Sequence, residues 1–166
     1  MTGVGTAAAE KEQNYLCTDA AFRKEMLDLH NTFRADHRAP ALTLDQTLNK
    51  VAEEWAQHLA ETHSFEHRPN PKYGENLYMM TSGGSDYAGA EEAFRGWADE
   101  EKDYDYRKPG FSMETGHFTQ VIWKSTERLG VARACVPDSS ETYVVANYDP
   151  PGNYEGRYPE NALRPK

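Results

Sequence analysis

The stretch GHFTQVIW, residues 116–123, places a histidine directly before an apolar run that ends in Trp123. Such a histidine is either a core residue with a hydrogen-bonded ring or a ligand and proton carrier. The apolar run indicates partial burial of His117, which makes it the least ordinary titratable side chain here. The choice between these two interpretations depends on which other residues of the chain lie beside the His117 ring.

The length and charge of the chain exclude several classes of function. A chain of 166 residues fits one domain with a single core. Its net charge of −9 repels phosphates, so nucleic acid is not expected as a general partner. The one candidate basic patch for an anionic membrane, a weak one, is Arg157, Arg164 and Lys166. No apolar run approaches the roughly 18 residues that a membrane span needs.

Three segments show the periodicity of amphipathic helices. Asp19 precedes the first and Asp45 the second, at positions typical of N-caps, and Ser85 or Asp86 precedes the third. The apolar faces of the three segments are Phe22, Met26, Leu29 and Phe33; Leu48, Val51, Ala52, Trp55 and Leu59; and Tyr87, Ala90, Phe94 and Trp97. We therefore expect three helices in the first two thirds of the domain.

The last third of the chain changes pattern. Residues 129–136 and 141–149 alternate, are rich in valine and flank the turn sequence PDSS, which predicts an antiparallel hairpin. The prolines and glycines after it predict irregular structure. Helices followed by strands around one core predict an α+β domain over residues 19–166, preceded by a flexible arm, residues 1–18.

The chain has two cysteines, Cys17 in the arm and Cys135 in the hairpin. A secreted protein of this size more often carries several, so we expect both to be free, although a bridge between them stays open. Residues 1–15 lack the apolar segment of a signal peptide. We accordingly expect a cytoplasmic location, with an extracellular one as the alternative if a leader has been trimmed.

Four side chains are candidates for chemistry: His67, Glu75, Glu100 and His117. By spacing alone, a loop histidine is usually just exposed, and Glu100 reads as part of a solvated acidic face. No HExxH, zinc-spaced cysteine pair or GxSxG motif is present in the sequence. Local motifs alone therefore define no active site.

Longer motifs carry a resemblance. GHFTQVIW resembles the first signature of the CAP superfamily, the cysteine-rich secretory, venom-antigen and pathogenesis-related proteins. The stretch NYDPPGNYEGRYPEN resembles the second signature of that superfamily, and YGENLY resembles its Gly-Glu-Asn element. The stretch LDLHNTFRADHRAPALTLD resembles its first helix and the turn that follows. Within the superfamily the chain most resembles the Golgi-associated plant pathogenesis-related branch. The resemblance implies a single-domain α-β-α sandwich with a short helix after the signature histidine.

The resemblance also implies a cleft lined by two histidines and two glutamates. Carried over to this chain, they are His117, Glu75, Glu100 and His67, with His63 as a poorer alternative to His67. The family usually has serine after this second histidine, where this chain has Arg68, a departure that could change access to the cleft.

The implied function is binding rather than catalysis. The family binds sterols and other lipids, membranes and partner proteins. The resemblance therefore also implies a homodimer or an unidentified protein partner, and a location at the Golgi membrane surface. His67 and His117 would hold Zn²⁺ or a similar divalent ion, and Glu75 and Glu100 would hold the ring tautomers or a metal-bound water. The alternative is a metal-dependent hydrolase in the same cleft.

One segment supports lipid binding locally. Residues 76–87, NLYMMTSGGSDY, place methionines and aromatics around glycines, which suits an adaptable apolar surface in a mobile loop. The expected lipid-contacting residues are Leu77, Tyr78, Met79, Met80 and Tyr87. The alternative is that these side chains cover the core.

Overall fold

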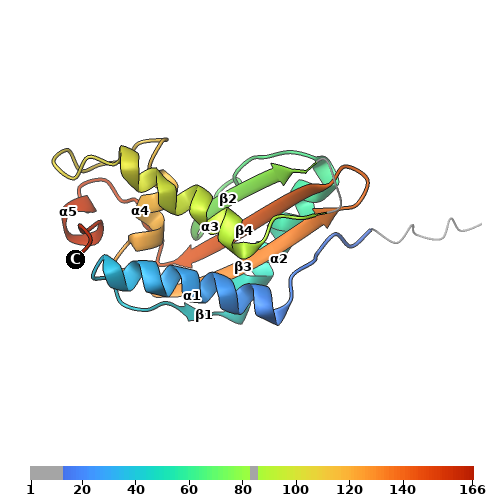
Figure 1. Ribbon diagram of the computed structural model, residues 1–166, viewed down its shortest axis with the longest axis horizontal. Coiled ribbons are helices and arrows are strands. Elements are labelled where there is room, and N and C mark those ends of the chain that lie inside the picture. Colours follow the sequence, from blue (N-terminus) through green and yellow to red (C-terminus); the bar gives the residue numbers. More distant parts are fainter. Residues whose placement is uncertain (1–12, 83–85) are drawn as a thin grey trace, which may run out of the picture.

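The computed structural model describes residues 13–82 and 86–166, and a four-stranded sheet forms its middle layer (Figure 1). The sheet has the order β1-β3-β4-β2, with β1 (Thr43–Leu44), β2 (Gly74–Thr81), β3 (Arg128–Val136) and β4 (Glu141–Asp149). β1 runs parallel to β3, whereas β3 pairs with β4 and β4 with β2 in antiparallel fashion. The expected hairpin and the mainly antiparallel sheet are confirmed.

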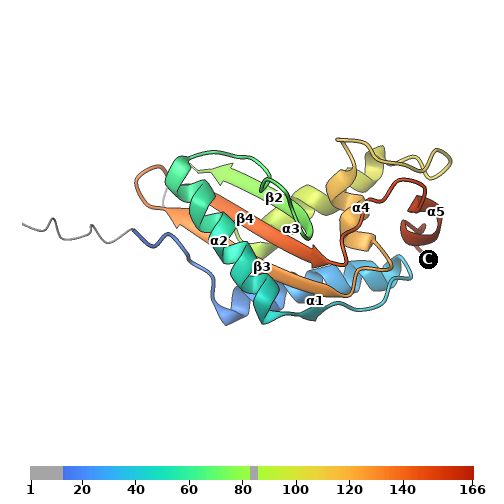
Figure 2. The same cartoon turned by 180° about the vertical axis from the view of Figure 1, so that it is seen from behind.

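Helices cover both faces of this sheet. α2 (Gln46–Thr62) lies on one face, as Figure 2 shows from behind. The other face carries α1 (Ala20–Asp36), α3 (Ala90–Ala98) and α4 (Gly116–Ile122) (Figure 1). The 3₁₀ helix η1 (Asp99–Asp103) follows α3 directly, and the short α5 (Tyr158–Asn161) lies near α4. The α-β-α sandwich, including the short signature helix, is thereby confirmed.

Aspartates begin the first two helices, as their positions predicted. The Phe22 amide donates to Asp19 Oδ1 over 2.7 Å, and the Leu48 amide donates to Asp45 Oδ1 over 3.0 Å. Each bond satisfies an N–H group that has no partner inside its helix.

The third helix begins later than predicted. Its N-cap is Gly89, and Tyr87 lies before the helix, so the expected cap at Asp86 is wrong. Glycine has no side chain that could cap the helix. Instead, the Gly89 amide donates to the Glu92 carboxylate over 3.5 Å, and this bond stabilises the first turn. The alternative cap, Ser85, lies outside the described residues.

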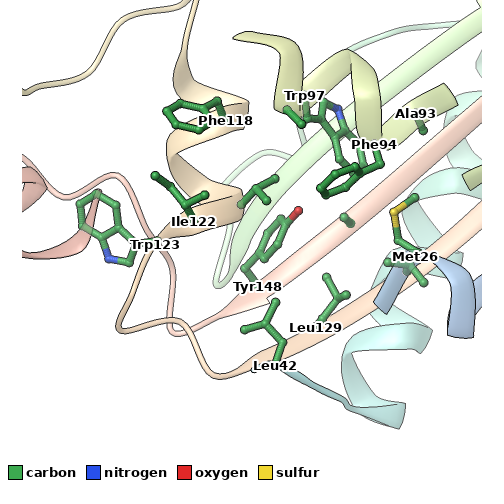
Figure 3. Packing of buried hydrophobic residues seen from close by; sticks show 14 of the residues in the cluster. Met26, Leu42, Ala93, Phe94, Trp97, Phe118, Ile122, Trp123, Leu129 and Tyr148 are labelled. Atoms are coloured by element: carbon green, nitrogen blue, oxygen red, sulfur yellow. The ribbon is translucent and has the colours of Figure 1, made fainter. Parts of the chain in front are cut away.

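Two apolar clusters fill the spaces between the layers, because successive strand residues point to opposite faces. Val144, Ala146 and Tyr148 of β4 pack with α1, α3 and α4, whereas Tyr143 and Val145 pack with α2. Figure 3 shows the first cluster, where Phe94 and Trp97 from α3 and Met26 from α1 lie over the sheet. Within it the Trp97 indole donates to the Leu77 carbonyl over 2.9 Å.

A buried arginine holds the end of α4. The guanidinium of Arg34 donates to the carbonyls of Pro40, Val121, Trp123 and Thr126 over 2.8 to 2.9 Å. Burial lowers the pKa of Arg34 to about 10, which still keeps the group charged at neutral pH. A cation from the first helix thus satisfies last-turn carbonyls of the signature helix.

The start of the described chain corrects two expectations. The Cys135 amide donates to the Tyr15 carbonyl over 2.8 Å, and the Cys17 amide donates to the Arg133 carbonyl over 2.9 Å. This register brings the Cα atoms of Cys17 and Cys135 to 5.9 Å, within bridging range, and the two form a disulfide. The expectation of free cysteines is wrong, and residues 15–18 are fastened to β3 rather than flexible, whereas residues 1–12 lie outside the described part.

The segment after the hairpin is irregular, as predicted, until α5 forms near its end. Across residues 13–82 and 86–166, no helix has both the length and the apolar composition that crossing a bilayer requires.

Candidate functional site

His117 is paired with Glu100 at the beginning of α4. The ring Nδ1–H donates to Glu100 Oε2 over 2.7 Å, and the Phe118 amide donates to the other carboxylate oxygen over 3.0 Å. Glu100 comes from η1, so it satisfies an N–H group of the first turn of the signature helix and also orients the histidine. The His117 side chain is 31% exposed, which makes its free Nε2 a site that solvent can reach.

A second histidine–carboxylate pair lies at the beginning of β2. The Nδ1–H of His67 donates to Glu75 Oε1 over 2.9 Å, and the Arg68 amide donates to the same oxygen over 3.1 Å. The Glu75 side chain is only 5% exposed, whereas that of His67 is 63% exposed. The hydrogen bond to the buried carboxylate raises the pKa of His67 above its usual value, because it stabilises the imidazolium.

Asn76 connects the two pairs. It follows Glu75 in β2, and its side chain therefore points to the opposite face of the sheet, toward α4. Its Nδ2 donates to the His117 carbonyl over 3.1 Å and to the Tyr148 hydroxyl over 3.2 Å. One amide group thus fixes the distance between the strand that carries Glu75 and the helix that carries His117.

The hydrogen bonds continue from Asn76 into the core. His30 donates from Nδ1 to the Met26 carbonyl over 2.8 Å, so its Nε2 accepts from the Tyr148 hydroxyl over 2.7 Å. Every donor in this chain of bonds has an acceptor, which holds α1, β4, β2 and α4 in one arrangement. Burial lowers the pKa of His30 to about 4, so this ring is neutral at physiological pH.

The structure separates His67 from its alternative, His63. The Nδ1–H of His63 donates to Glu141 Oε2 over 3.0 Å. Glu141 begins β4, whereas Asn147, the partner of Glu75 in the sheet, lies six residues further along that strand. At about 3.4 Å per residue, this distance is roughly 20 Å. His63 therefore lies at the other end of the sheet from the Glu75 carboxylate.

Arg68, which departs from the family pattern, is held against α2. Its Nη2 donates to the Val51 carbonyl over 3.0 Å, and its guanidinium lies 5.5 Å from the centre of the Trp55 ring. These contacts fasten the loop that carries His67 to the face of α2.

A cleft of about 360 Å³ opens beside the His67–Glu75 pair. It is lined by His67, Pro71, Tyr73, Gly74, Glu75, Gln120 and residues 151–154 of the second signature. His117 is not one of these lining residues; it lies one helical turn before Gln120 and bonds to Glu100 instead. The four residues implied by the resemblance thus form two pairs, and joint metal ligation by the two histidines stays a prediction.

Each of the two histidines is hydrogen-bonded to one glutamate. Each ring uses Nδ1 for its carboxylate, which leaves Nε2 as the nitrogen that can bind a metal. Within residues 13–82 and 86–166, no group of three or more His, Cys, Asp or Glu side chains is placed to hold a metal ion. Water would have to complete the coordination of any bound ion.

Sequence reasoning did not single out three polar residues that shape this region: Asn76, Gln120 and Asn153. Gln120 accepts from the Gly152 amide over 2.9 Å, and Asn153 accepts from the Thr119 hydroxyl over 2.6 Å. A Cβ on Gly74 would lie 2.2 Å from Gln120 Oε1, so this glycine permits the approach of α4 to β2. The sequence feature that could have identified them is that each carries a side-chain amide inside one of the quoted motifs.

The expected lipid-binding loop is a strand over most of its length. Leu77, Tyr78, Met79 and Met80 lie in β2, paired with β4, and Leu77 is buried. The Tyr78 ring packs against Gly96 of α3, and Met79 is 36% exposed. The prediction of a mobile loop here is wrong for residues 76–81, because antiparallel pairing fixes them, and residues 83–85 lie outside the described part.

An apolar recess lies elsewhere, between α1 and α3. A groove of about 780 Å³ has a mixed lining of the apolar residues Ala21, Leu29, Phe33, Ala35 and Phe94 and the polar residues Lys24, Glu25, Asp28, Thr32, Asp36 and Lys166. Lys24 and Asp28 of this lining form an ion pair, 2.6 Å apart. The periodicity of α1 assigned Leu29 and Phe33 to the core, but the groove leaves both partly uncovered.

Known proteins resemble this chain over most of its length. The family described as "CAP: Cysteine-rich secretory protein family" matches residues 27–148. The human Golgi-associated plant pathogenesis-related protein 1 is 40% identical over 147 residues, 87% of this chain and 94% of the relative. The Secreted protein RBT4 of Candida albicans is 38% identical over 161 residues, which cover 89% of this chain and 42% of that protein.

A solved structure agrees with the fold. The crystal structure of NaASP2 with Zn²⁺ has a TM-score of 0.70 at 26% identity, covering 93% of this chain and 90% of that chain.

Proposed function

Since the chain belongs to the cysteine-rich secretory protein (CAP) family, we propose that it is a non-enzymatic binding protein for a lipid with an apolar chain. The groove between α1 and α3 is the observation that carries this proposal. It offers apolar side chains from two helices in a recess large enough for a lipid tail. Burying each methylene of a bound chain contributes about 0.8 kcal/mol, so about ten buried methylenes contribute about 8 kcal/mol, which corresponds to micromolar affinity before the costs of ordering are subtracted.

The groove replaces the surface that the sequence favoured. Leu77 is buried and cannot contact a ligand without disrupting β2, whereas Leu29 and Phe33 line an open recess. The charged lining residues are Lys24, Glu25, Asp28, Asp36 and Lys166, and Lys24 is paired with Asp28. Two cations against three carboxylates give no preference for an anionic head group, so both a fatty acid and an uncharged lipid are tested.

Titration with a fluorescent fatty acid and a fluorescent sterol tests the location. Ala21 is exposed on the groove, so Ala21→Trp obstructs it without a change in the core. We expect this variant to weaken binding at least about tenfold, or 1.4 kcal/mol. The matched control, Met79→Asp with Met80→Asp, should bind as the wild type does. Loss of binding in the control, with wild-type binding in Ala21→Trp, would return the site to β2.

We also propose that the two histidine–glutamate pairs hold one divalent ion such as Zn²⁺. His67 and His117 would bind it through Nε2, and Glu75 and Glu100 would hold the ring orientations. The crystal structure of NaASP2 contains Zn²⁺; that ion belongs to NaASP2, and it supports the proposal for this chain by similarity. A bound ion would supply a Lewis acid.

The alternative of a metal-dependent hydrolase has weaker support. Catalytic zinc sites usually have three protein ligands and a water. The donor set here offers two imidazoles, since both carboxylates are engaged by the Nδ1 atoms of the rings. We therefore place the metal in a binding protein.

We propose an oxidising compartment, extracellular or in the secretory pathway, rather than the cytoplasm. The Cys17–Cys135 disulfide supports this, because such bridges are rare in reducing compartments. Relatives include a Golgi-associated human protein and a secreted fungal one, and both locations agree with the family. Fractionation of cells that express the full-length protein would test the choice.

A further inference from the structure

A pocket of about 460 Å³ lies where α2 meets the loop before β2, on the face of the sheet that α2 covers (Figure 2). Its volume is within the range of roughly 300–1,000 Å³ that is usual for small-molecule sites. It is lined by Val51 and Trp55 of α2, residues 68–73 of the loop, Glu75 and Asn147. We call it the α2 pocket. The groove between α1 and α3 is a different site, with none of these lining residues.

Two buried polar atoms on residues that line the α2 pocket are unpaired. Neither Arg68 Nε nor Asn147 Oδ1 has a hydrogen-bond partner within the part of the chain that the structure describes. Asn147 is only 2% exposed, and its Nδ2 donates to the Gly74 carbonyl over 3.2 Å, which fixes the orientation of the amide. Its position in β4 alternates with Val145, which packs with α2, so Asn147 also points to the α2 face.

Unpaired buried groups of this kind need a partner from outside the chain. A buried donor or acceptor without a hydrogen bond destabilises the fold, and native proteins rarely leave one in that state. Here a donor, the Nε–H of Arg68, and an acceptor, the Oδ1 of Asn147, belong to the lining of one pocket. A ligand group that enters this pocket can satisfy both.

The guanidinium of Arg68 is held in place for this role. Its Nη2 donates to the Val51 carbonyl over 3.0 Å and lies 3.4 Å from a carboxylate oxygen of Glu54. These bonds engage Nη2 and leave Nε without a partner in the described chain. Serine, which the resemblance implies at this position, has no such group, so the donor is a feature of this chain.

The unpaired atoms define the chemistry of the ligand. A carboxylate or a phosphate oxygen only accepts, and an ammonium group only donates, so neither can satisfy both atoms. Hydroxyl and amide groups donate and accept. The charges of the lining give no reason for a charged ligand, because Arg68 is paired with Glu54, and Glu75 is paired with His67. A neutral ligand therefore fits the pocket best.

We propose that the α2 pocket binds a neutral small molecule that carries hydroxyl and amide groups, such as an N-acetylated sugar. One ligand group accepts from the Nε–H of Arg68, and another donates to Oδ1 of Asn147. The rings of Pro69, Pro71 and Tyr73 offer apolar surface against which the C–H groups of a sugar ring pack. Neither the lipid groove nor a bound metal takes part in this binding.

The three tryptophans of the chain provide a local test. Trp55 lines the α2 pocket, whereas Trp97 and Trp123 are buried in the apolar cluster on the opposite face of the sheet. Titration with N-acetylglucosamine, in the presence of a metal chelator, should move the Trp55 indole N–H signal in proton–nitrogen NMR spectra until it saturates. The other two indole signals should stay in place, and Trp55→Phe assigns the signal.

Two further probes identify the recognised group. Glucose carries hydroxyls without the amide, so a saturable shift with glucose of similar affinity would show that the hydroxyls suffice. A shift with N-acetylglucosamine alone would show that the amide is required. Acetate should leave the Trp55 signal unmoved, because a carboxylate cannot donate to Asn147.

Two variants test the unpaired atoms. Arg68→Lys keeps the charge but has no Nε–H, and Asn147→Leu replaces the amide with an apolar side chain of similar size. Each should weaken binding at least about tenfold. The matched control is Arg95→Lys, since this arginine of α3 is 65% exposed and does not line the pocket, and it should bind like the wild type. Urea denaturation shows whether each variant folds, and Arg68→Lys decides the matter alone if Asn147→Leu does not.

Three results would overturn the proposal. The first is a wild type whose Trp55 signal shows no saturable shift with either sugar. The second is equal affinity in Arg68→Lys and the wild type. The third is a saturable shift with acetate that matches the shift with N-acetylglucosamine. Zinc and fatty acid are absent from these titrations, so failure here is distinguishable from failure of the metal site or the lipid groove.

Discussion

Asn76 of β2 donates its side-chain amide to the main-chain carbonyl of His117 in α4, over 3.1 Å. The two residues are far apart in sequence. Asn76 directly follows Glu75 of one histidine–glutamate pair, and His117 belongs to the other pair. This bond couples the position of the signature helix to the strand that carries Glu75. It makes Asn76 a structural determinant of the candidate metal site.

Replacing this amide should destabilise the fold. Asn76→Ala removes a buried donor and leaves the His117 carbonyl without that bond, so we expect the free energy of unfolding to fall by about 1–3 kcal/mol. Urea denaturation of the variant measures the change. Gln46→Ala, at an exposed position at the beginning of α2, is the control and should stay within about 0.5 kcal/mol of the wild type. Equal stabilities of the two variants would contradict a structural role for Asn76.

Zinc calorimetry should identify the metal ligands. We expect His67→Ala and His117→Ala to lose binding, and His63→Ala, whose ring bonds to Glu141, to keep it. Glu75→Gln and Glu100→Gln should weaken binding by about 10–100-fold, because these carboxylates orient the rings. Loss of binding only in His63→Ala would mean that the wrong loop histidine has been assigned. If all variants bind alike, the metal lies elsewhere.

Zinc affinity should also depend on pH in a defined direction. The Glu75 carboxylate raises the pKa of His67 above the usual histidine value of about 6.5. Protons therefore begin to compete with the metal at a higher pH than for an ordinary histidine. Affinity should therefore fall as pH falls through this raised pKa. In Glu75→Gln the proton competition should move to lower pH, and an unchanged pH profile would argue against His67 as a ligand.

The disulfide should be present and stabilising. Alkylation under denaturing, non-reducing conditions should leave Cys17 and Cys135 unlabelled, and reduction should expose both to the reagent. Cys17→Ser with Cys135→Ser should lower the free energy of unfolding by about 2–5 kcal/mol, because the bridge restricts the unfolded chain. Two labels without reductant would show that the cysteines are free.

Acid should destabilise the protein through His30. Its folded-state pKa of about 4 lies below the unfolded value of about 6.5, so the unfolded chain binds the proton more readily. Its contribution is therefore full above the unfolded value and is lost as pH falls from about 6.5 toward about 4. Urea midpoints across this range should drop more steeply for wild type than for His30→Phe, which has no proton to bind. Parallel slopes would mean that another group governs the acid limb.

Much of the local structure followed from the sequence. The caps at Asp19 and Asp45 and the helices behind them depend on side-chain type and spacing, and both formed where predicted. The hairpin of β3 and β4 likewise followed from alternation across a short turn. These features are local, so neighbouring residues carry the information that specifies them.

Strand β2 shows where a prediction from neighbouring residues alone fails. The polar and methionine-rich residues of Gly74–Thr81 resemble a loop in isolation, and they become a strand because β4 supplies hydrogen-bond partners. That pairing in turn sets Glu75 opposite Asn147 and so selects His67 over His63.

Residue type and order along the chain were enough to predict the family, the capped helices and the hairpin, and they proposed four candidate residues for the site with His63 left open as an alternative to His67. Tertiary structure alone decided the Cys17–Cys135 bridge, the division of the site into two pairs joined by Asn76, and the groove beside α1. The bridge joins residues 118 positions apart, and the groove exists only where two separate helices fail to cover each other's apolar faces. Such features depend on how surfaces meet in space, which residue type and spacing along one segment do not encode.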